Sequence, residues 1–232
     1  MIEEPKSLTV RKDWKRPTKE QVDAFRDVTT SFVVDAMDGR GALNMSIRPI
    51  GDGRDLNCVA VGPAITADNG PADLLATLAA MSFMKAGDIL VAGNDGHQGT
   101  AVAGDRVMGM LKNNGGVGFV TDGPMRDYQG IVDAGVPAWC TGLNPASPFG
   151  SGPGRVGLPL NIGGQTVKSG DMIIADRDGV VVVPFEQIDQ AIERLQHVKS
   201  LEAKLDAEVA EGRTSFDTVT AMLNDGRTRY VE

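Results

Sequence analysis

Short segments rich in β-branched and other apolar residues alternate with segments of helical periodicity between residues 58 and 142. The apolar segments predict strands, among them 58–67 and 117–121, and the periodic segment 103–113 predicts a helix. A helix between two strands returns the chain to the same end of the sheet, so successive strands can run parallel. The sequence therefore predicts an α/β protein whose sheet has some parallel pairing.

Helix caps and spacing predict the remaining helices of this layer. Thr18 and Gln21 have the spacing of a capping box and predict a helix over 19–28. Ser31 is expected to cap a second, short helix that ends at Gly39 or Gly41. A third helix, with Pro71 in its first turn, is expected to bury one face made of Leu74, Leu75, Leu78 and Met81.

Two segments of the chain repeat one pattern. "KAGDILVAGNDG" at 85–96 and "KSGDMIIADRDG" at 168–179 both predict a tight turn, a buried strand and a turn outward. They are either copies of one duplicated supersecondary unit or two segments that form the same turn-strand-turn independently. Short segments built on glycine and aspartate turns converge easily, which favours the second explanation.

The end of the chain has the pattern of a long amphipathic helix. From Gln187 onward, apolar residues recur at three- and four-residue steps: Ile188, Ile192, Leu195, Val198, Leu201 and Leu205. We expect this helix to extend past the body and to pack partly on a neighbouring subunit, with one short helix after it. No linker separates two domains, so we predict an arm and helix at 1–28, an α/β core at 29–184 and a helical extension at 185–232.

Composition narrows the class of partner and the location. A net charge of −8 argues against nucleic-acid binding, which needs clustered Lys and Arg. No segment approaches the ~20 apolar residues of a membrane span, and the first residues lack the apolar stretch of a secretory signal. Cys58 and Cys140 are isolated and have no metal-ligand spacing. We expect a soluble, cytoplasmic protein with no nucleic-acid or membrane partner.

A charged pair, Arg126-Asp127, follows the predicted strand 117–121 and a Gly-Pro turn. Loops at the carboxyl ends of strands in an α/β layer are where ligands usually bind. Arg126 could hold a carboxylate or enolate oxygen, and Asp127 could ligate a hard cation such as Mg²⁺. Alternatively, Asp127 caps the next helix and Arg126 is solvated, which position alone slightly favours.

The start of the predicted helix 103–113 is a second candidate for ligand binding. It follows the Gly-rich stretch "AGNDGHQGTAVAGD", and the free N–H groups of a helix start attract anions. Asp105 in the first turn could instead serve only the helix dipole. A Gly-rich entry to a helix is common, so this feature is weak by itself.

These motifs together resemble the RraA-like family. The likeness is carried by "GDRV" at 104–107, "DGPMRD" at 122–127 and "GDMIIADRDGVVVVP" from 170, and it extends from about Thr29 to Gly212. The family includes 4-hydroxy-4-methyl-2-oxoglutarate / 4-carboxy-4-hydroxy-2-oxoadipate aldolases and regulators of ribonuclease activity. The resemblance implies the RraA-like swivelling β/β/α layered fold, as a single domain with a long C-terminal helix.

The resemblance also implies an activity, a class II pyruvate aldolase that depends on Mg²⁺ or Mn²⁺ and decarboxylates oxaloacetate. Asp127 would ligate the metal and Arg126 would contact the C2 oxygen of the pyruvyl group. The segment Gly104, Asp105, Arg106 and Val107 would bind the substrate through its backbone amides, with Asp105 also near the metal waters. Glu202 would reach the site of an adjacent subunit of a homotrimer or homohexamer, although a solvated helix face would also carry such a residue.

Other chemistries fit the sequence less well. A Schiff-base mechanism needs a desolvated lysine, whereas Lys85 and Lys168 are predicted in turns and Lys112 near a helix end. A zinc site is poorly supported because His97 and His197 are far apart, although His97 could contact substrate. Arg106 replaces an apolar residue more usual in the aldolase motif, which points to a more acidic substrate or to another reaction. A different oxo-acid lyase or hydrolase, or a non-catalytic ribonuclease-binding regulator, remains the alternative.

Overall fold

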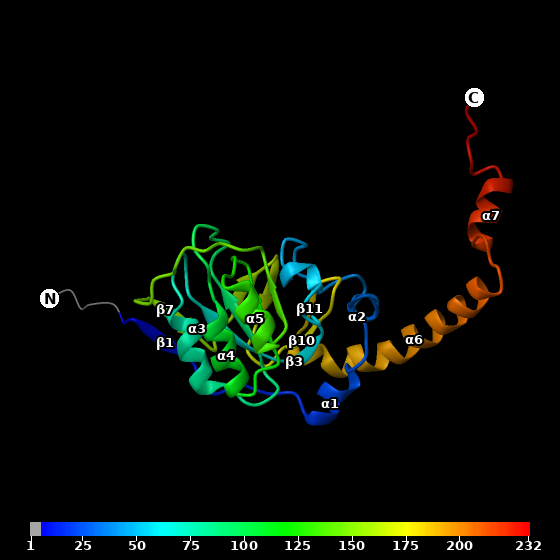
Figure 1. Cartoon of the computed structure of the whole chain (residues 1–232). Coiled ribbons are helices and arrows are strands. Elements are labelled where there is room, and N and C mark those ends of the chain that lie inside the picture. Colours follow the sequence, from blue (N-terminus) through cyan, green and yellow to red (C-terminus); the bar gives the residue numbers. More distant parts are fainter. Residues whose placement is uncertain (1–5) are drawn as a thin grey trace.

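Strand β3 (Ala60–Asp68) organises the fold because it belongs to two sets of strands. The computed structural model describes residues 6–232 and is a mixed α/β body from which a helical arm extends (Figure 1). The first half of β3 pairs antiparallel with β10 (Met172–Ala175), from Ala60 opposite Ala175 to Pro63 opposite Met172. Its second half pairs parallel with β4 (Ile89–Gly93). Both sets of strands are thus built on one segment.

The larger set of strands has the order β1-β7-β3-β4-β5-β6-β2. Its central strands β3, β4, β5 (Gly118–Thr121) and β6 (Ala138–Cys140) run parallel, and β4 and β5 are buried along their whole length. The predicted parallel pairing is confirmed. The outer strands of this set are β1 (Leu8–Val10), β7 (Gly154–Val156) and β2 (Arg48–Pro49). β11 (Val180–Val183) pairs with β10, and β8 (Leu160–Ile162) and β9 (Gln165–Val167) form a separate two-stranded sheet.

Helices connect the parallel strands, as the alternating sequence pattern predicts. α3 (Leu75–Ala80) follows β3, α4 (Asp105–Asn113) follows β4, and α5 (Tyr128–Ala134) follows β5. The other helices are α1 (Lys19–Ala24), α2 (Thr30–Ala36), α6 (Ile188–Ala210) and α7 (Asp217–Asn224). The connections place the starts of α4 and α5 after neighbouring parallel strands, and this positions the site described below.

The first two helices differ from their predicted bounds. The capping box at Thr18 is present, but α1 ends at Ala24 because the chain turns over the next residues, where Asp27 adopts a left-handed φ of 58°. Ser31 does not cap α2, which begins one residue earlier. Asp176, distant in sequence, accepts the Thr30 N–H at 2.8 Å and so satisfies this helix start.

The predicted buried face of α3 is correct only in part, because Met81 is buried and Leu74 is partly buried against the core, but Leu78 is not. Leu78 is 37% exposed, and the buried residues of the helix are Ala76, Thr77 and Ala80. A Cβ on Gly154 of β7 would lie 2.9 Å from the Cβ of Ala76, so helix and strand backbones approach closely. Small side chains permit that approach, and Leu78 lies on the exposed side of the helix.

The two repeated segments share local geometry but not topology. Asp88 accepts the Lys85 N–H at 2.8 Å, and Asp171 accepts the Lys168 N–H at 2.7 Å, so the same turn precedes β4 and β10. The strands that follow run in opposite directions along β3. This arrangement favours convergence of two segments on the same turn and strand over duplication of one unit.

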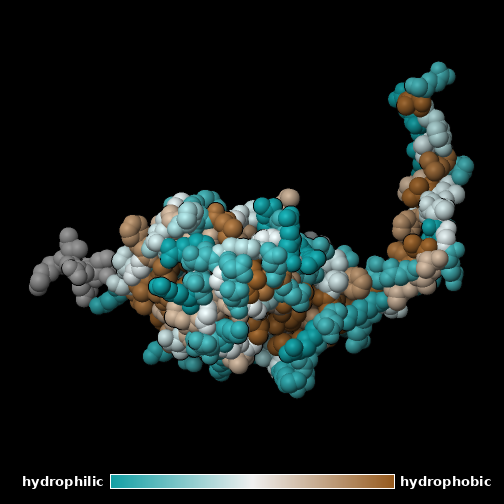
Figure 2. Space-filling model, in the orientation of Figure 1, coloured by the Kyte–Doolittle hydropathy of each residue, from teal (hydrophilic) through white to brown (hydrophobic). Residues whose placement is uncertain are grey.

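The long helix α6 extends past the body, as predicted, but only its beginning is buried. Ile188, Ala191 and Leu195 pack against α1, α2, β10 and β11, whereas Leu201 is 54% exposed. Figure 1 shows α6 leaving the body and carrying α7 away from it, and Figure 2 shows apolar residues along that outer part. Among residues 6–232, no helix combines the length and apolar character needed to cross a bilayer.

Candidate active site

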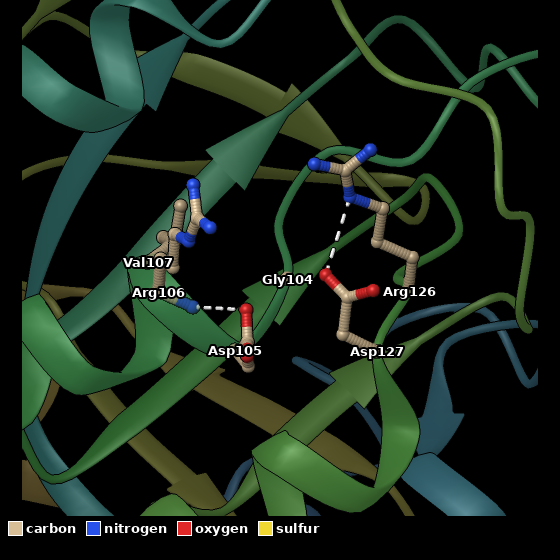
Figure 3. Close-up of a pocket in the computed structure, with 6 residues that line it drawn as sticks. All are labelled: Gly104, Asp105, Arg106, Val107, Arg126 and Asp127. Atoms are coloured by element: carbon tan, nitrogen blue, oxygen red, sulfur yellow. Dashed lines mark hydrogen bonds and ion pairs between the residues drawn. The ribbon is translucent and has the colours of Figure 1, made fainter.

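A cavity of about 360 Å³ lies where the start of α4 faces the loop between β5 and α5. Its lining residues are Gly104, Asp105, Arg106 and Val107 from α4 and its N-cap, and Arg126 and Asp127 from the loop (Figure 3). The structure thus brings the two candidate segments of the sequence together. His97 does not line this cavity.

Backbone hydrogen bonds hold the two walls of the cavity together. The N–H of Arg126 donates to the carbonyl of Ala103 at 3.0 Å, and Ala103 and Met125 form a parallel bridge. Because these residues adjoin the functional side chains directly, the walls cannot separate without breaking main-chain bonds. The cavity is therefore a preformed part of the fold.

The side chain of Asp127 is available for a ligand. Asp127 occupies the N-cap position of α5 in a left-handed conformation (φ 61°, ψ 47°), but its carboxylate accepts no capping hydrogen bond. Instead, its Oδ2 lies 3.3 Å from the Nε of Arg126, and the side chain is 45% exposed. The alternative that Asp127 only caps the helix is wrong.

Arg126 is held on two sides, so the alternative of a freely solvated side chain is also wrong. Its Nε faces Asp127, and its Nη1 donates to the hydroxyl of Ser147. Ser147 lies in the Pro- and Gly-rich segment 143–159, where nothing in the sequence marks one serine above another. Sequence reasoning missed Ser147 because only the folded loop brings it to Arg126.

Two glycines make room for the carboxylates. A Cβ on Gly104 would lie 2.4 Å from Oδ2 of Asp127, and a Cβ on Gly130 would lie 2.5 Å from the Cβ of Asp105. Both distances are far below normal contact, so each glycine occupies space that a larger residue would take from the site. The close approach of α4 and α5 depends on them.

The first turn of α4 combines N–H donors with one carboxylate and one guanidinium. Asp105 Oδ1 accepts the N–H of Arg106 at 2.6 Å, so this side chain does serve the helix start. Its Oδ2 accepts no hydrogen bond from residues 6–232. The guanidinium of Arg106 is exposed and makes no ion pair or hydrogen bond within the same residues. N–H groups at a helix start have no carbonyl partner within the helix, so this turn can bind an anion.

Asp122, the first residue of the "DGPMRD" motif, anchors the Gly-rich loop. It accepts the N–H groups of Asn94 at 2.7 Å and Gly96 at 2.9 Å, although burial raises the pKa of its carboxyl. His97 lies in this loop, and its buried Nε2 has no partner among residues 6–232. Asp122 therefore has a structural role, ordering the loop that precedes the cavity.

The remaining candidate positions lie away from the cavity. Glu202 and His197 are on α6, which leaves the body, so Glu202 does not reach the cavity of its own chain. The described residues contain no group of three or more His, Cys, Asp or Glu side chains that could enclose a metal ion. A metal at this cavity would be held by few protein ligands.

Comparison with known proteins gives matches over most of the chain. A family model described as "RraA-like: Aldolase/RraA" matches residues 30–182, which include every residue lining the cavity. A protein of Halalkalibacterium halodurans, named "Putative 4-hydroxy-4-methyl-2-oxoglutarate aldolase", is 35% identical over 173 residues, or 75% of this chain and 80% of that protein.

Solved structures match the fold over a similar length. Streptomyces coelicolor RraAS2, described as an unusual member of the RNase ES inhibitor RraA protein family, aligns with a TM-score of 0.72 and 27% identity, covering 83% of this chain and 100% of that one. An uncharacterized protein of Pseudomonas syringae pv. tomato aligns with a TM-score of 0.76 over 87% of this chain and 93% of its own, at 24% identity. At that identity the second likeness concerns the fold alone.

Proposed function

The chain belongs to the RraA-like family, and from this premise we propose that its cavity cleaves a 4-hydroxy-2-oxo acid, such as 4-hydroxy-4-methyl-2-oxoglutarate, to pyruvate and a second oxo acid. The observation that carries the proposal is the Asp127 carboxylate, which occupies a helix cap without capping and faces Arg126 across 3.3 Å. Capping of α5 therefore does not account for the place of this carboxylate. The name of the Halalkalibacterium halodurans relative supports the choice of an aldolase.

The reaction places negative charge where the cavity has donors. In a retro-aldol cleavage the C4 hydroxyl loses its proton, the C3–C4 bond breaks, and the bonding electrons form an enolate at the C2 oxygen. Arg126, fixed by Ser147, donates to that oxygen as its charge develops. The N–H groups of the first turn of α4, around Val107, bind the C1 carboxylate. Oxaloacetate decarboxylation forms the same pyruvate enolate, so we propose that activity as well.

The donor set of the cavity fits Mg²⁺ or Mn²⁺. Mg²⁺ is commonly held by one or two carboxylates and keeps several waters, and Asp127 supplies a half-exposed carboxylate of this kind. Zn²⁺ sites usually have three or four protein ligands, and the described residues offer no such group. When bound, the divalent cation would act as a Lewis acid that stabilises the enolate.

Proton transfer is assigned to two further carboxylates. Asp105 Oδ1 is occupied by the Arg106 N–H, so its Oδ2 is the atom that can accept a proton. Glu202 of a neighbouring subunit completes the site in this proposal, because α6 carries it away from its own cavity. The functional unit would then be a homotrimer or a homohexamer.

A ribonuclease-binding regulator is the second candidate function. The likeness to RraAS2, which covers the whole of that chain at 27% identity, favours it. The two candidates differ in a simple observable, since a regulator of this kind need not release pyruvate. A purified sample that forms no pyruvate from oxaloacetate or from any 4-hydroxy-2-oxo acid would support the regulator.

The test measures pyruvate with lactate dehydrogenase and NADH. We expect turnover of oxaloacetate and 4-hydroxy-4-methyl-2-oxoglutarate with Mg²⁺, loss of turnover with EDTA, and recovery with excess Mg²⁺ or Mn²⁺. Asp127→Ala should abolish the activity. Turnover that persists in EDTA would refute the metal mechanism while leaving an aldolase.

A further inference from the structure

Tyr128 is the first residue of α5 and directly follows Asp127, a carboxylate of the cavity. Its hydroxyl donates to Oδ2 of Asp55 at 2.7 Å, although the two residues are 73 positions apart in sequence. Tyr128 also packs against the main hydrophobic core, so its side chain is held both by packing and by its hydroxyl. A contact between distant segments therefore fixes the residue next to the proposed metal ligand.

Asp55 lies in a loop, residues 50–56, that is attached to the body at both ends. Ile50 and Leu56 are buried in the main hydrophobic core, and Arg177 donates from its Nη2 to the carbonyl of Gly53 at 2.9 Å. An acceptor carried by such a loop keeps its place relative to the sheet. Asp55 is thus a fixed anchor for Tyr128, although its own side chain is exposed.

The backbone of this loop follows a path that leaves room for the tyrosine. Gly51, Asp52 and Gly53 have left-handed φ values of 59°, 55° and 65°. A Cβ on Gly51 would overlap the Tyr128 ring, lying only 2.6 Å from its Cζ. A larger residue at position 51 would push the loop and the hydroxyl apart, so the close approach of loop and ring depends on this glycine.

The position of the Asp127 carboxylate depends on the residues around it. Asp127 makes no side-chain capping hydrogen bond to α5, and its ion-pair partner is the Nε of Arg126 at 3.3 Å. Its left-handed backbone (φ 61°, ψ 47°) directs the carboxylate and continues directly into Tyr128. Because one planar peptide unit joins the two residues, a shift at the start of α5 is transmitted to the carboxylate.

We propose that Tyr128 and Asp55 are a positioning pair for Asp127. Their hydrogen bond holds the start of α5 so that the Asp127 carboxylate keeps the place from which it binds a divalent cation. Neither residue of the pair lines the cavity, so both act through Asp127. The inference rests on the proposed function, in which Asp127 is the metal ligand. Loss of the hydrogen bond then lowers the affinity of the protein for the cation.

Titration with Mn²⁺, followed by the electron paramagnetic resonance signal of the free ion, measures this affinity without turnover. Removing a group that orients a metal ligand typically lowers metal affinity roughly 10- to 100-fold. Tyr128 acts through the main chain, so for Tyr128→Phe we expect the low end of that range, a rise of about tenfold in the Kd of Mn²⁺.

Variants of Asp55 test whether the hydrogen bond itself is responsible. Asp55→Ala should raise the Kd of Mn²⁺ as much as Tyr128→Phe does. Asp55→Asn should keep most of the affinity, because its amide oxygen still accepts a hydrogen bond. The double variant Tyr128→Phe/Asp55→Ala should bind Mn²⁺ no more weakly than either single variant, since both remove the same interaction.

The second of the two tyrosines in the chain provides a matched control. The Tyr230 hydroxyl donates to the carbonyl of Leu223 at 2.9 Å, in the segment after α6. Tyr230→Phe removes the same group and should leave the Kd of Mn²⁺ unchanged. Asp52→Ala removes a carboxylate from the loop 50–56 that pairs with Arg54 at 3.4 Å, and it should also leave the Kd unchanged.

Thermal unfolding separates positioning from a general contribution to stability. All Kd values are compared at a temperature at which every variant is folded. A hydrogen bond that only stabilises the fold would lower Tm in Tyr128→Phe and leave the Kd of Mn²⁺ as in the wild type. That result would overturn the inference. A rise in Kd that Asp55→Ala does not share, or that Tyr230→Phe does share, would overturn it as well.

Asp127→Ala separates the inference from the function on which it rests. If the wild-type protein binds Mn²⁺ and Asp127→Ala does not, the metal site stands, and an unchanged Kd in Tyr128→Phe refutes the positioning role alone. If the wild-type protein binds no Mn²⁺, or binds it no better than Asp127→Ala, the proposed metal ligand is wrong and the inference fails with it.

Discussion

Gly104→Ala perturbs the site without removing any of its functional groups. Gly104 has φ −139° and ψ −167°, an extended conformation that alanine can adopt. The new Cβ would lie 2.4 Å from Oδ2 of Asp127 and 3.1 Å from Cγ of Arg126. Ordinary contact begins near 3.4 Å, so the carboxylate must withdraw by about 1 Å. The substitution therefore tests whether the position of Asp127 matters, apart from its presence.

The expected effects on activity and stability differ in size. A displacement of about 1 Å in a catalytic group can lower the rate roughly 100-fold, which is ~2.7 kcal/mol of transition-state stabilisation. The stability cost is smaller, because the displaced atom is the end of a half-exposed side chain. Replacing glycine by alanine at an N-cap costs about 0.5–1 kcal/mol, so Tm should fall by only about 1–4 °C.

The assay follows pyruvate release from 4-hydroxy-4-methyl-2-oxoglutarate in parallel with thermal unfolding. Gly109→Ala is the matched control, since Gly109 lies in the same helix and a Cβ there meets nothing within 4 Å. We expect this control to keep wild-type kcat/KM and to gain up to about 1 kcal/mol of stability. Wild-type kcat/KM in Gly104→Ala would refute the requirement for this carboxylate position. A Tm loss far beyond the control would show instead that the backbone had moved.

Further substitutions and a thiol measurement test other parts of the site and core. Arg126→Ala should lower kcat/KM by roughly two decades or more, about 3 kcal/mol. An unchanged rate in the pyruvate assay would contradict the role of Arg126 in stabilising the charge on the C2 oxygen. Ser147→Ala should lower kcat roughly tenfold and change KM less, because the Arg126 guanidinium loses its hydrogen bond to the Ser147 hydroxyl. Steady-state kinetics of Ser151→Ala, a serine of the same loop, would show whether the loss of kcat is specific to Ser147. Burial raises the pKa of the Cys140 thiol from 9.0 to about 11, so this thiol should react slowly with iodoacetamide near pH 8 until urea unfolds the chain, and fast labelling of the native protein would contradict its burial. Because the folded pKa of Cys140 lies above the unfolded value, its contribution to the free energy of unfolding is complete below pH 9.0 and is lost as pH rises through about 11, which urea unfolding at a series of pH values would measure.

The two segments that line the cavity were predictable because their positions depend on local sequence signals. The turn after a buried strand placed Arg126 and Asp127, and the glycine before a periodic segment placed the start of α4. Parallel strands bring such loops to one edge of the sheet, so a single topological rule was enough to expect them together. The roles of these residues in binding and catalysis remain predictions.

What the sequence could not predict depends on contacts between distant segments. The close approach of Gly154 to Ala76 determines which face of α3 is buried, and no local pattern reports that contact. Asp176 satisfies the start of α2 from a position about 150 residues away in sequence, so Ser31 was a reasonable but wrong cap. Ser147 reaches Arg126 only through the path of an irregular loop.

Because β3 pairs with both β10 and β4, the chain cannot be cut into independent fragments between the cavity and β10. Its first half is held by β10, and its second half by β4, so the segments before and after the cavity share one strand. A fragment ending before residue 168 would contain the whole cavity but would expose an edge over Ala60–Pro63, where the apolar β10 normally pairs. An open apolar edge invites pairing with other chains. Such a fragment should aggregate, and adding residues 168–184 as a separate peptide should restore a dispersed species.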